Sequence, residues 1–170
     1  MALTLDRRTE VEAKALEVLG EFQINSLPID PARLARGKNY HVEYRDLSEE
    51  NFRGVLSGKK IAIDSTIESP SMKRFIVAHE LGHGELGHGN SEMPNELCDC
   101  EGSCNDKEAA ASLFARSLLM PVHYLEKAIE IYQGKDTTAF SSCIEYLSHM
   151  FGVTERRVNE RLVECGVEAC

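Results

Sequence analysis

The segment His79-Glu-Leu-Gly-His83 places two histidines and a glutamate at a spacing suited to metal chemistry. Residues four apart lie on one face of an α-helix, so both imidazoles can reach one metal ion, about where a single Zn²⁺ would sit. Glu80 follows the first histidine and can reach a water molecule on that metal. The motif therefore predicts metal-assisted hydrolysis of an amide bond, with Glu80 as the catalytic residue.

The residues around this motif are apolar, so the helix that carries it is expected to be largely buried; they are Phe75, Ile76, Val77, Ala78 and Leu81. Two histidines and a glutamate are costly in a buried helix unless they are paired or bind a metal. The alternative is an ordinary helix whose histidines only make hydrogen bonds. The motif and its apolar context together favour the metal.

A catalytic zinc usually has three protein ligands and one open position, so a third ligand must come from elsewhere. We expect Glu108, at the start of a predicted helix that ends before Pro121. Small residues on the same face would let this helix pack closely on the histidine helix, and Ser112 could support a ligand from behind. The alternative for Glu108 is a solvated side chain favoured by the helix dipole. Competing ligands lie in or near the preceding loop: Glu96, Asp99, Glu101 and Asp106.

The elements that must position these residues follow from apolar periodicity, turn residues and caps. Helices are expected over residues 4–20, from Pro31 with Asp30 as its cap, from Pro70 through the motif, over 107–120, from 122 to about 132, over 138–150 and after Thr154. Strands are expected at 40–44 and in a hairpin of 54–57 with 60–64, and residues 90–106 are expected to form a long loop. The strand at 60–64 could pair with an extended substrate.

The last two helices form a helix, turn and helix around Phe151-Gly-Val-Thr154, with Thr154 as N-cap. Val158 and Leu162 are expected to face inward, and the arginines to lie partly outward: Arg156, Arg157 and Arg161. Such a pair occurs in DNA-binding proteins. The acidity of the chain favours a pair that closes the core instead.

Length, composition and charge limit the kinds of protein that this chain can be. The chain has 170 residues with 42% hydrophobic content, which is ordinary for one globular domain. The formal charge of -9 argues against binding to nucleic acid, no apolar run reaches the length of a membrane span, and the N-terminus is too polar for a secretory signal. A cytoplasmic protein with reduced cysteines is therefore expected.

Three of the 6 cysteines form a local cluster between the two ligand-bearing helices: Cys98, Cys100 and Cys104. They could cap the catalytic zinc, bind a second metal or sense redox state. The spacing lacks an obvious fourth ligand and is a weak zinc signature, so incidental thiols in a polar loop are the favoured interpretation.

The chain resembles the ImmA/IrrE family of zinc metallopeptidases. The matching segments are Leu27–Asp30, Arg74–His83 with His88, Glu108, Phe114-Ala115, Leu118–Pro121, Phe151–Thr154 and Arg161-Leu162. The resemblance implies one zinc per chain on His79, His83 and Glu108, with Glu80 as the base. It also implies site-specific cleavage of a helix-turn-helix repressor that controls mobile-element or stress genes. The chain departs from the family at Gly84, where a bulky residue is common, at Ala110 and Ser112, and in the segment 90–106.

We therefore expect an α+β, zincin-like metallopeptidase, mostly helical, with a small sheet beside the histidine helix. It would form one domain in three parts: residues 1–69, 70–121 and 122–170. Residues that could stabilise the oxyanion are His123, Tyr124, Tyr146 and His149. The alternative function is a non-proteolytic regulatory or protein-binding module with a structural zinc site. The oligomeric state does not follow from the sequence.

Overall fold

The computed structural model describes residues 3–24, 26–94, 106–134 and 140–168. The fold is α+β. In chain order, the elements of the described residues are α1 (Leu5–Gly20), α2 (Pro31–Gly37), β1 (His41–Arg45), β2 (Phe52–Ser57), β3 (Lys60–Asp64), α3 (Pro70–Glu85), β4 (Ser91–Pro94), α4 (Asp106–Leu119), α5 (Val122–Gly134), α6 (Cys143–Phe151) and α7 (Glu155–Cys165).

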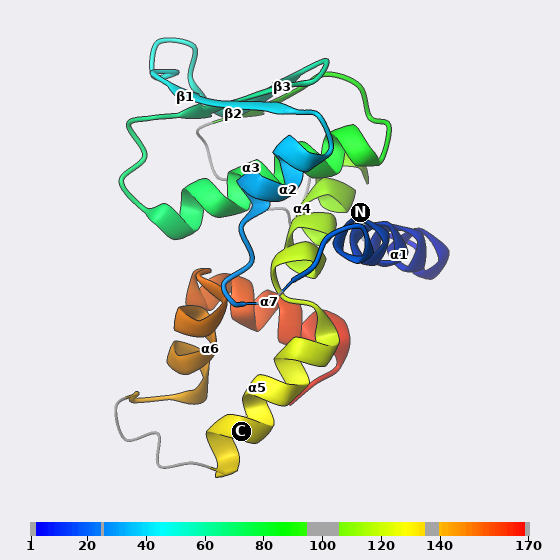
Figure 1. The fold of residues 1–170 in the computed structure, drawn as a ribbon, viewed down its shortest axis with the longest axis vertical. Helices are drawn as coiled ribbons and strands as arrows, with labels where there is room; N and C mark the ends of the chain where they lie inside the picture. The colour runs from blue at the N-terminus through cyan, green and yellow to red at the C-terminus, as the bar shows by residue number, and fades with distance from the viewer. Residues whose placement is uncertain (1–2, 25, 95–105, 135–139, 169–170) are drawn as a thin grey trace.

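The strands form one small mixed sheet in the order β1-β3-β2-β4. β1 is parallel to β3, whereas β2 is antiparallel to both β3 and β4. Figure 1 shows the sheet at one end of the long axis, with α3 beneath it and α5 and α6 at the other end. β3 has a neighbour on both sides, so the expectation that residues 60–64 pair with a substrate is wrong. In the described part of the chain, β1 and β4 are the outer strands of the sheet.

Close helix packing holds α3 in place. Ser69 caps the helix by accepting from the backbone N–H of Met72 at 3.3 Å, and Pro70 occupies the first turn. Gly82 lets α4 approach, because a Cβ there would lie 2.9 Å from Cδ1 of Phe114. Residues 75–83 of α3 are all buried, as expected from the apolar context of the motif.

The structure confirms most of the expected elements and corrects two. Asp30 caps α2 through the backbone N–H groups of Ala32 and Arg33, and the hairpin of β2 and β3 forms as expected. Residues 91–94, expected as part of a loop, form strand β4 on the edge of β2. α6 begins at Cys143, later than expected, because Ser142 caps it by accepting from the N–H of Glu145 at 3.1 Å.

The α6–α7 pair closes the core, as the acidity of the chain favoured. Gly152 makes the turn with a φ of 61°, and Thr154 precedes α7 without a side-chain cap. The expectation that Arg161 lies outward is wrong. Its side chain is buried, donates to the carbonyl of Met120 at 3.2 Å and pairs with Glu12 of α1 at 2.7 Å. A buried charge needs such partners, and here they tie α7 to α1 and α4.

None of the described helices is long and apolar enough to cross a membrane.

Candidate metal centre

Three side chains from α3 and α4 meet at one point. Nε2 of His79 lies 3.1 Å from Nε2 of His83. Glu108 lies across from both, with Oε2 at 3.1 Å from Nε2 of His79 and Oε1 at 3.2 Å from Nε2 of His83. Both histidines are buried and Glu108 is half-buried. These three residues form a group that could hold a metal ion.

The spacing of the three ligand atoms fits a tetrahedral metal. Ligands at the usual zinc distance of about 2.0–2.1 Å and at tetrahedral angles are about 3.3 Å apart, close to the distances observed. If each histidine donates from Nε2 to its own oxygen of Glu108, the two Nε2 atoms face each other at 3.1 Å without an acceptor between them, whereas a central cation attracts both nitrogens and the carboxylate. Burial would raise the pKa of Glu108, but hydrogen bonds to His79 and His83 lower it below its usual range. The carboxylate is therefore ionised and suited to bind a cation.

Each histidine has a hydrogen-bond partner behind it. Nδ1 of His79 lies 3.3 Å from Oγ of Ser112, and Nδ1 of His83 lies 3.2 Å from Nδ1 of His88. A histidine that binds metal through Nε2 carries its proton on Nδ1 and donates it to such a partner. Burial and nearby positive charge lower the pKa of His88 to about 4, so this ring is neutral at pH 7 and can accept.

Arg7 of α1 approaches the far side of His88. Its Nη2 atom lies 3.2 Å from Nε2 of His88. If His88 accepts at Nδ1 from His83, its own proton is on Nε2, where it faces a guanidinium that can only donate. The contact with Arg7 therefore has to loosen when His83 adopts the tautomer that binds metal.

Glu80 is fully buried beside the histidines. Its Oε2 accepts a hydrogen bond from Oγ of Ser91 at 2.5 Å. Its Oε1 is buried and has no hydrogen-bond partner within the described part of the chain. Burial raises the pKa of Glu80 above its usual range, opposed by His79 and by the hydrogen bond from Ser91. A buried carboxylate with one unpaired oxygen is costly for a structural role and is typical of a functional group.

A cleft of about 490 Å³ opens onto His83 and Glu108. Its other lining residues come from β2, the turn after α3, β4 and the start of α4: Val55, Leu56, Ser57, His88, Asn90, Ser91, Glu92 and Lys107. The half-exposed Glu108 and two residues of β4, Ser91 and Glu92, thus border the same cleft.

Of the competing ligands, Asp106 lies in the described part of the chain and does not join this group. Asp106 lies exposed at the start of α4 and is not part of the cluster. Glu96, Asp99 and Glu101 lie outside the described residues, as do Cys98, Cys100 and Cys104.

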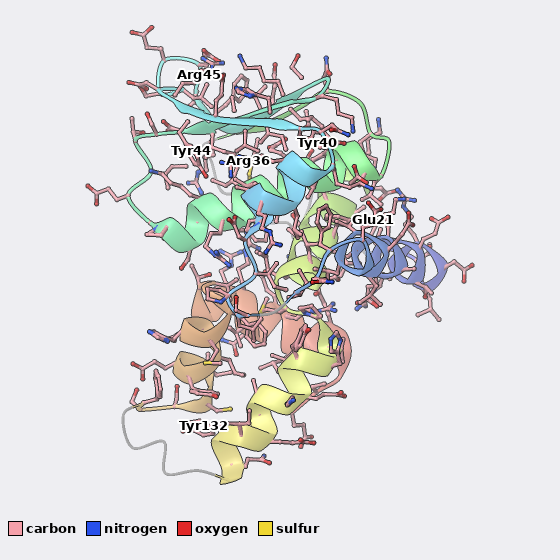
Figure 2. The ribbon with its side chains drawn as sticks, in the orientation of Figure 1. Glu21, Arg36, Tyr40, Tyr44, Arg45 and Tyr132 are labelled. Atoms are coloured by element: carbon pink, nitrogen blue, oxygen red, sulfur yellow. The ribbon has the colours of Figure 1, made fainter. Side chains whose placement is uncertain are left out.

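The structure does not bring the proposed oxyanion donors to the metal centre. His123 and Tyr124 are at the start of α5, beyond the end of α4, and α4 alone separates Glu108 from Leu119 by roughly 17 Å. Tyr146 packs against Tyr132, which Figure 2 shows at the opposite end of the molecule from the sheet, and against Phe140. His149 also packs against Phe140. They were chosen for their chemistry alone, which carries no information on distance.

Sequence reasoning missed three residues around the site. Ser91 was overlooked because residues 90–106 were expected to be a loop, and Arg7 because it is remote in sequence. His88 was part of the family resemblance, but no role was assigned to it. A polar residue on the strand that follows the motif and a histidine five residues after His83 are signals that could have found Ser91 and His88.

A comparison with protein families identifies one that covers most of the chain. Residues 33–163 match the model of a peptidase family, M78, described as the IrrE N-terminal-like domain. The match includes the motif, Glu108 and β4, and it excludes α1. The comparison with curated proteins gives no match.

Proposed function

This chain belongs to the peptidase family of the IrrE N-terminal-like domain, and from that premise we propose that it is a zinc-dependent endopeptidase. The observation that carries the proposal is the mutual approach of His79, His83 and Glu108 to 3.1–3.2 Å beside the buried Glu80. Metal ligands and a general base for water are the two components that metal-assisted hydrolysis of a peptide bond requires.

The three ligands and Glu80 have separate roles. A zinc ion held by His79, His83 and Glu108 would lower the pKa of a water molecule toward about 7 and polarise the scissile carbonyl. Glu80 accepts the proton of the attacking water and later delivers it to the leaving amine, a role worth roughly 10²–10⁴-fold in rate. The raised pKa of Glu80 suits a group that must both take up and release a proton.

The cleft suits an extended protein segment. Among the described residues β4 pairs with β2 alone, and Ser91 and Glu92 line the cleft. An extended peptide can add to such an edge through main-chain hydrogen bonds, which carries the peptide past the metal ligands. This assigns to β4 the pairing role that we had expected of residues 60–64.

We propose a helix-turn-helix transcriptional repressor as the substrate, cut at one site to induce mobile-element or stress genes. The support is the family resemblance, and such a substrate places the reaction in the cytoplasm. Direct binding of this chain to DNA is disfavoured. Arg161 is buried, Arg157 stacks on Phe75 at 3.8 Å, and Arg156 pairs with Glu160 at 3.0 Å.

A non-proteolytic module with a structural zinc is the alternative. Structural sites usually have four protein ligands, whereas the group in the described residues has three. A structural site also needs no buried base such as Glu80. Both features favour the enzyme.

The test is co-expression with helix-turn-helix repressors encoded near the gene of this chain, comparing wild type, Glu80→Gln and Glu126→Gln. Glu126 is an exposed glutamate of α5 and serves as the matched control. Wild type and Glu126→Gln are expected to cut the repressor at one bond, and Glu80→Gln to leave it intact while binding zinc. Cleavage by Glu80→Gln at the wild-type rate would contradict the assignment of the base.

A further inference from the structure

The two oxygens of the Glu80 carboxylate differ in their hydrogen bonding. Oε2 accepts from Oγ of Ser91 at 2.5 Å, and Oε1 has no hydrogen-bond partner among the described residues. The last torsion of a glutamate side chain has a broad energy profile, so nothing intrinsic holds a carboxylate in one orientation. The hydroxyl of Ser91 is the contact that distinguishes the two oxygens.

The backbone around Ser91 fixes the position of that hydroxyl. Gly87 and Gly89 turn the chain after α3 with φ values of 69° and 83°, which favour glycine. Oδ1 of Asn90 then accepts from the backbone N–H of Gly58 at 2.9 Å, which ties the start of β4 to the β2–β3 turn. Ser91 itself pairs with Leu56 in the sheet. Ser91 is therefore held by the sheet and not by a loose loop.

The other oxygen of the carboxylate lies close to the backbone of a glycine. Gly54 of β2 lies beside Glu80, and a Cβ there would be 2.9 Å from Oε1. Oε1 therefore has room only because residue 54 lacks a side chain. One oxygen of the carboxylate thus contacts a donor on β4, and the other approaches a glycine on β2.

We propose that Ser91 is a positioning residue for the reaction. Its hydroxyl fixes Oε2 of Glu80, so that Oε1 remains the proton acceptor for the attacking water. The inference rests on the proposed function of Glu80 as the base. Ser91 acts through Glu80 and not on the metal, so its removal should change the geometry of the base without changing metal affinity.

The test uses the protein loaded with cobalt(II), whose visible absorption reports ligand binding, and acetohydroxamate as the probe. A hydroxamate chelates the metal and shares its proton with a neighbouring carboxylate, so its affinity depends on where Glu80 lies. The variants are Ser91→Ala, Ser91→Thr and the control Ser65→Ala, an exposed serine after β3. Each is also made in the Glu80→Gln background, and cobalt affinity and melting temperature are measured for all.

Ser91→Ala is expected to weaken acetohydroxamate about tenfold or more, as loss of a hydrogen bond to a charged group does. Ser91→Thr keeps the hydroxyl, so its affinity for acetohydroxamate is expected to stay within about threefold of wild type. The affinity of the control Ser65→Ala is expected to equal that of wild type. In the Glu80→Gln background, Ser91→Ala is expected to cost nothing further. An equal loss in both backgrounds would overturn the proposal, because Ser91 would then not act through Glu80.

A second measurement separates this inference from the proposed function. Crystal structures of metal-free wild type and Ser91→Ala are expected to show the Glu80 carboxylate turned or spread over several orientations in the variant. An unchanged carboxylate overturns the role of Ser91, whatever the probe affinities are. Failure of wild type to bind cobalt would contradict the proposed function, while the two crystal structures would still decide the role of Ser91.

Discussion

The hydroxyl of Tyr40 occupies the space that a side chain at position 84 would need. A Cβ on Gly84 would lie 2.2 Å from Oη of Tyr40. Tyr40 is buried, donates to Oε1 of Glu85 at 3.1 Å and lies beneath Nζ of Lys59, which is 3.7 Å from the ring centroid. Figure 2 shows it beside the C-terminal end of α3. This contact explains why position 84, directly after the second histidine, accommodates glycine.

Gly84→Leu is expected to destabilise the fold by about 1–3 kcal/mol, the usual effect of overpacking. In a Tyr40→Ala background the added side chain fills the space of the lost ring, so the same change should cost less, with a coupling of about 0.5–3 kcal/mol. Urea unfolding of the four proteins measures this. Gly20→Leu is the control, because a Cβ on Gly20 meets nothing within 4 Å. Additive free energies would show that Tyr40 and Gly84 do not compete for this space.

Glu108→Ala and Asp106→Ala separate the proposed ligand from a neighbouring acid on the same helix. Glu108→Ala should lower zinc affinity by more than the roughly 10–100-fold typical of losing an outer-shell partner. Asp106 is exposed and outside the cluster, so Asp106→Ala should match wild type. Competition with a chromogenic chelator measures both. Greater damage from Asp106→Ala would show that the wrong carboxylate was assigned.

His88→Leu removes the acceptor behind His83, whereas His88→Gln keeps one in its side-chain carbonyl. Zinc affinity should fall about 10–100-fold in the leucine variant and less in the glutamine variant. Chelator competition again gives the affinities, and the melting temperature of the metal-free proteins controls for unfolding. Equal affinities for His88→Leu and wild type would mean that the 3.2 Å contact does not orient His83.

Arg7→Gln tests the competition between α1 and the metal. The guanidinium can only donate toward Nε2 of His88, whereas the glutamine carbonyl can accept from it. The substitution therefore removes the donor that disfavours a proton on Nε2 of His88. The tautomer of His88 that accepts from His83 becomes more favourable, and zinc affinity should rise. Arg7→Met, which neither donates nor accepts, should fall between glutamine and arginine. A lower affinity in Arg7→Gln than in wild type would contradict this account of the contact.

The parts of the structure that depend on nearby residues followed from the sequence. The i and i+4 spacing brings His79 and His83 together on α3, and the helix-face argument for Glu108 agrees with its position opposite them. Caps such as Asp30 are local as well. Whether the three parts of the chain fold as one domain stays a prediction.

The parts that depend on distant pairing did not follow. β4 is a strand because it lies beside β2, and its own four residues carry no alternating pattern, so Ser91 was not identified as a neighbour of Glu80. Arg161 was expected partly outward on the helix face away from Val158 and Leu162, but Glu12, 149 residues away in sequence, provides a partner for the buried charge. Tyr146 was proposed as an oxyanion donor only because its hydroxyl can donate. In the structure its ring packs against Tyr132 of α5 and against Phe140, which precedes α6.

The central claim is that one zinc ion binds to His79, His83 and Glu108. Anomalous diffraction recorded on both sides of the zinc absorption edge, from crystals of zinc-loaded protein, tests it most directly. We expect one strong peak per chain, at about 2.0–2.2 Å from Nε2 of both histidines and from a carboxylate oxygen of Glu108. His79→Ala/His83→Ala crystals should lack that peak. A peak at other side chains, or none at this site in fully loaded protein, would contradict the account.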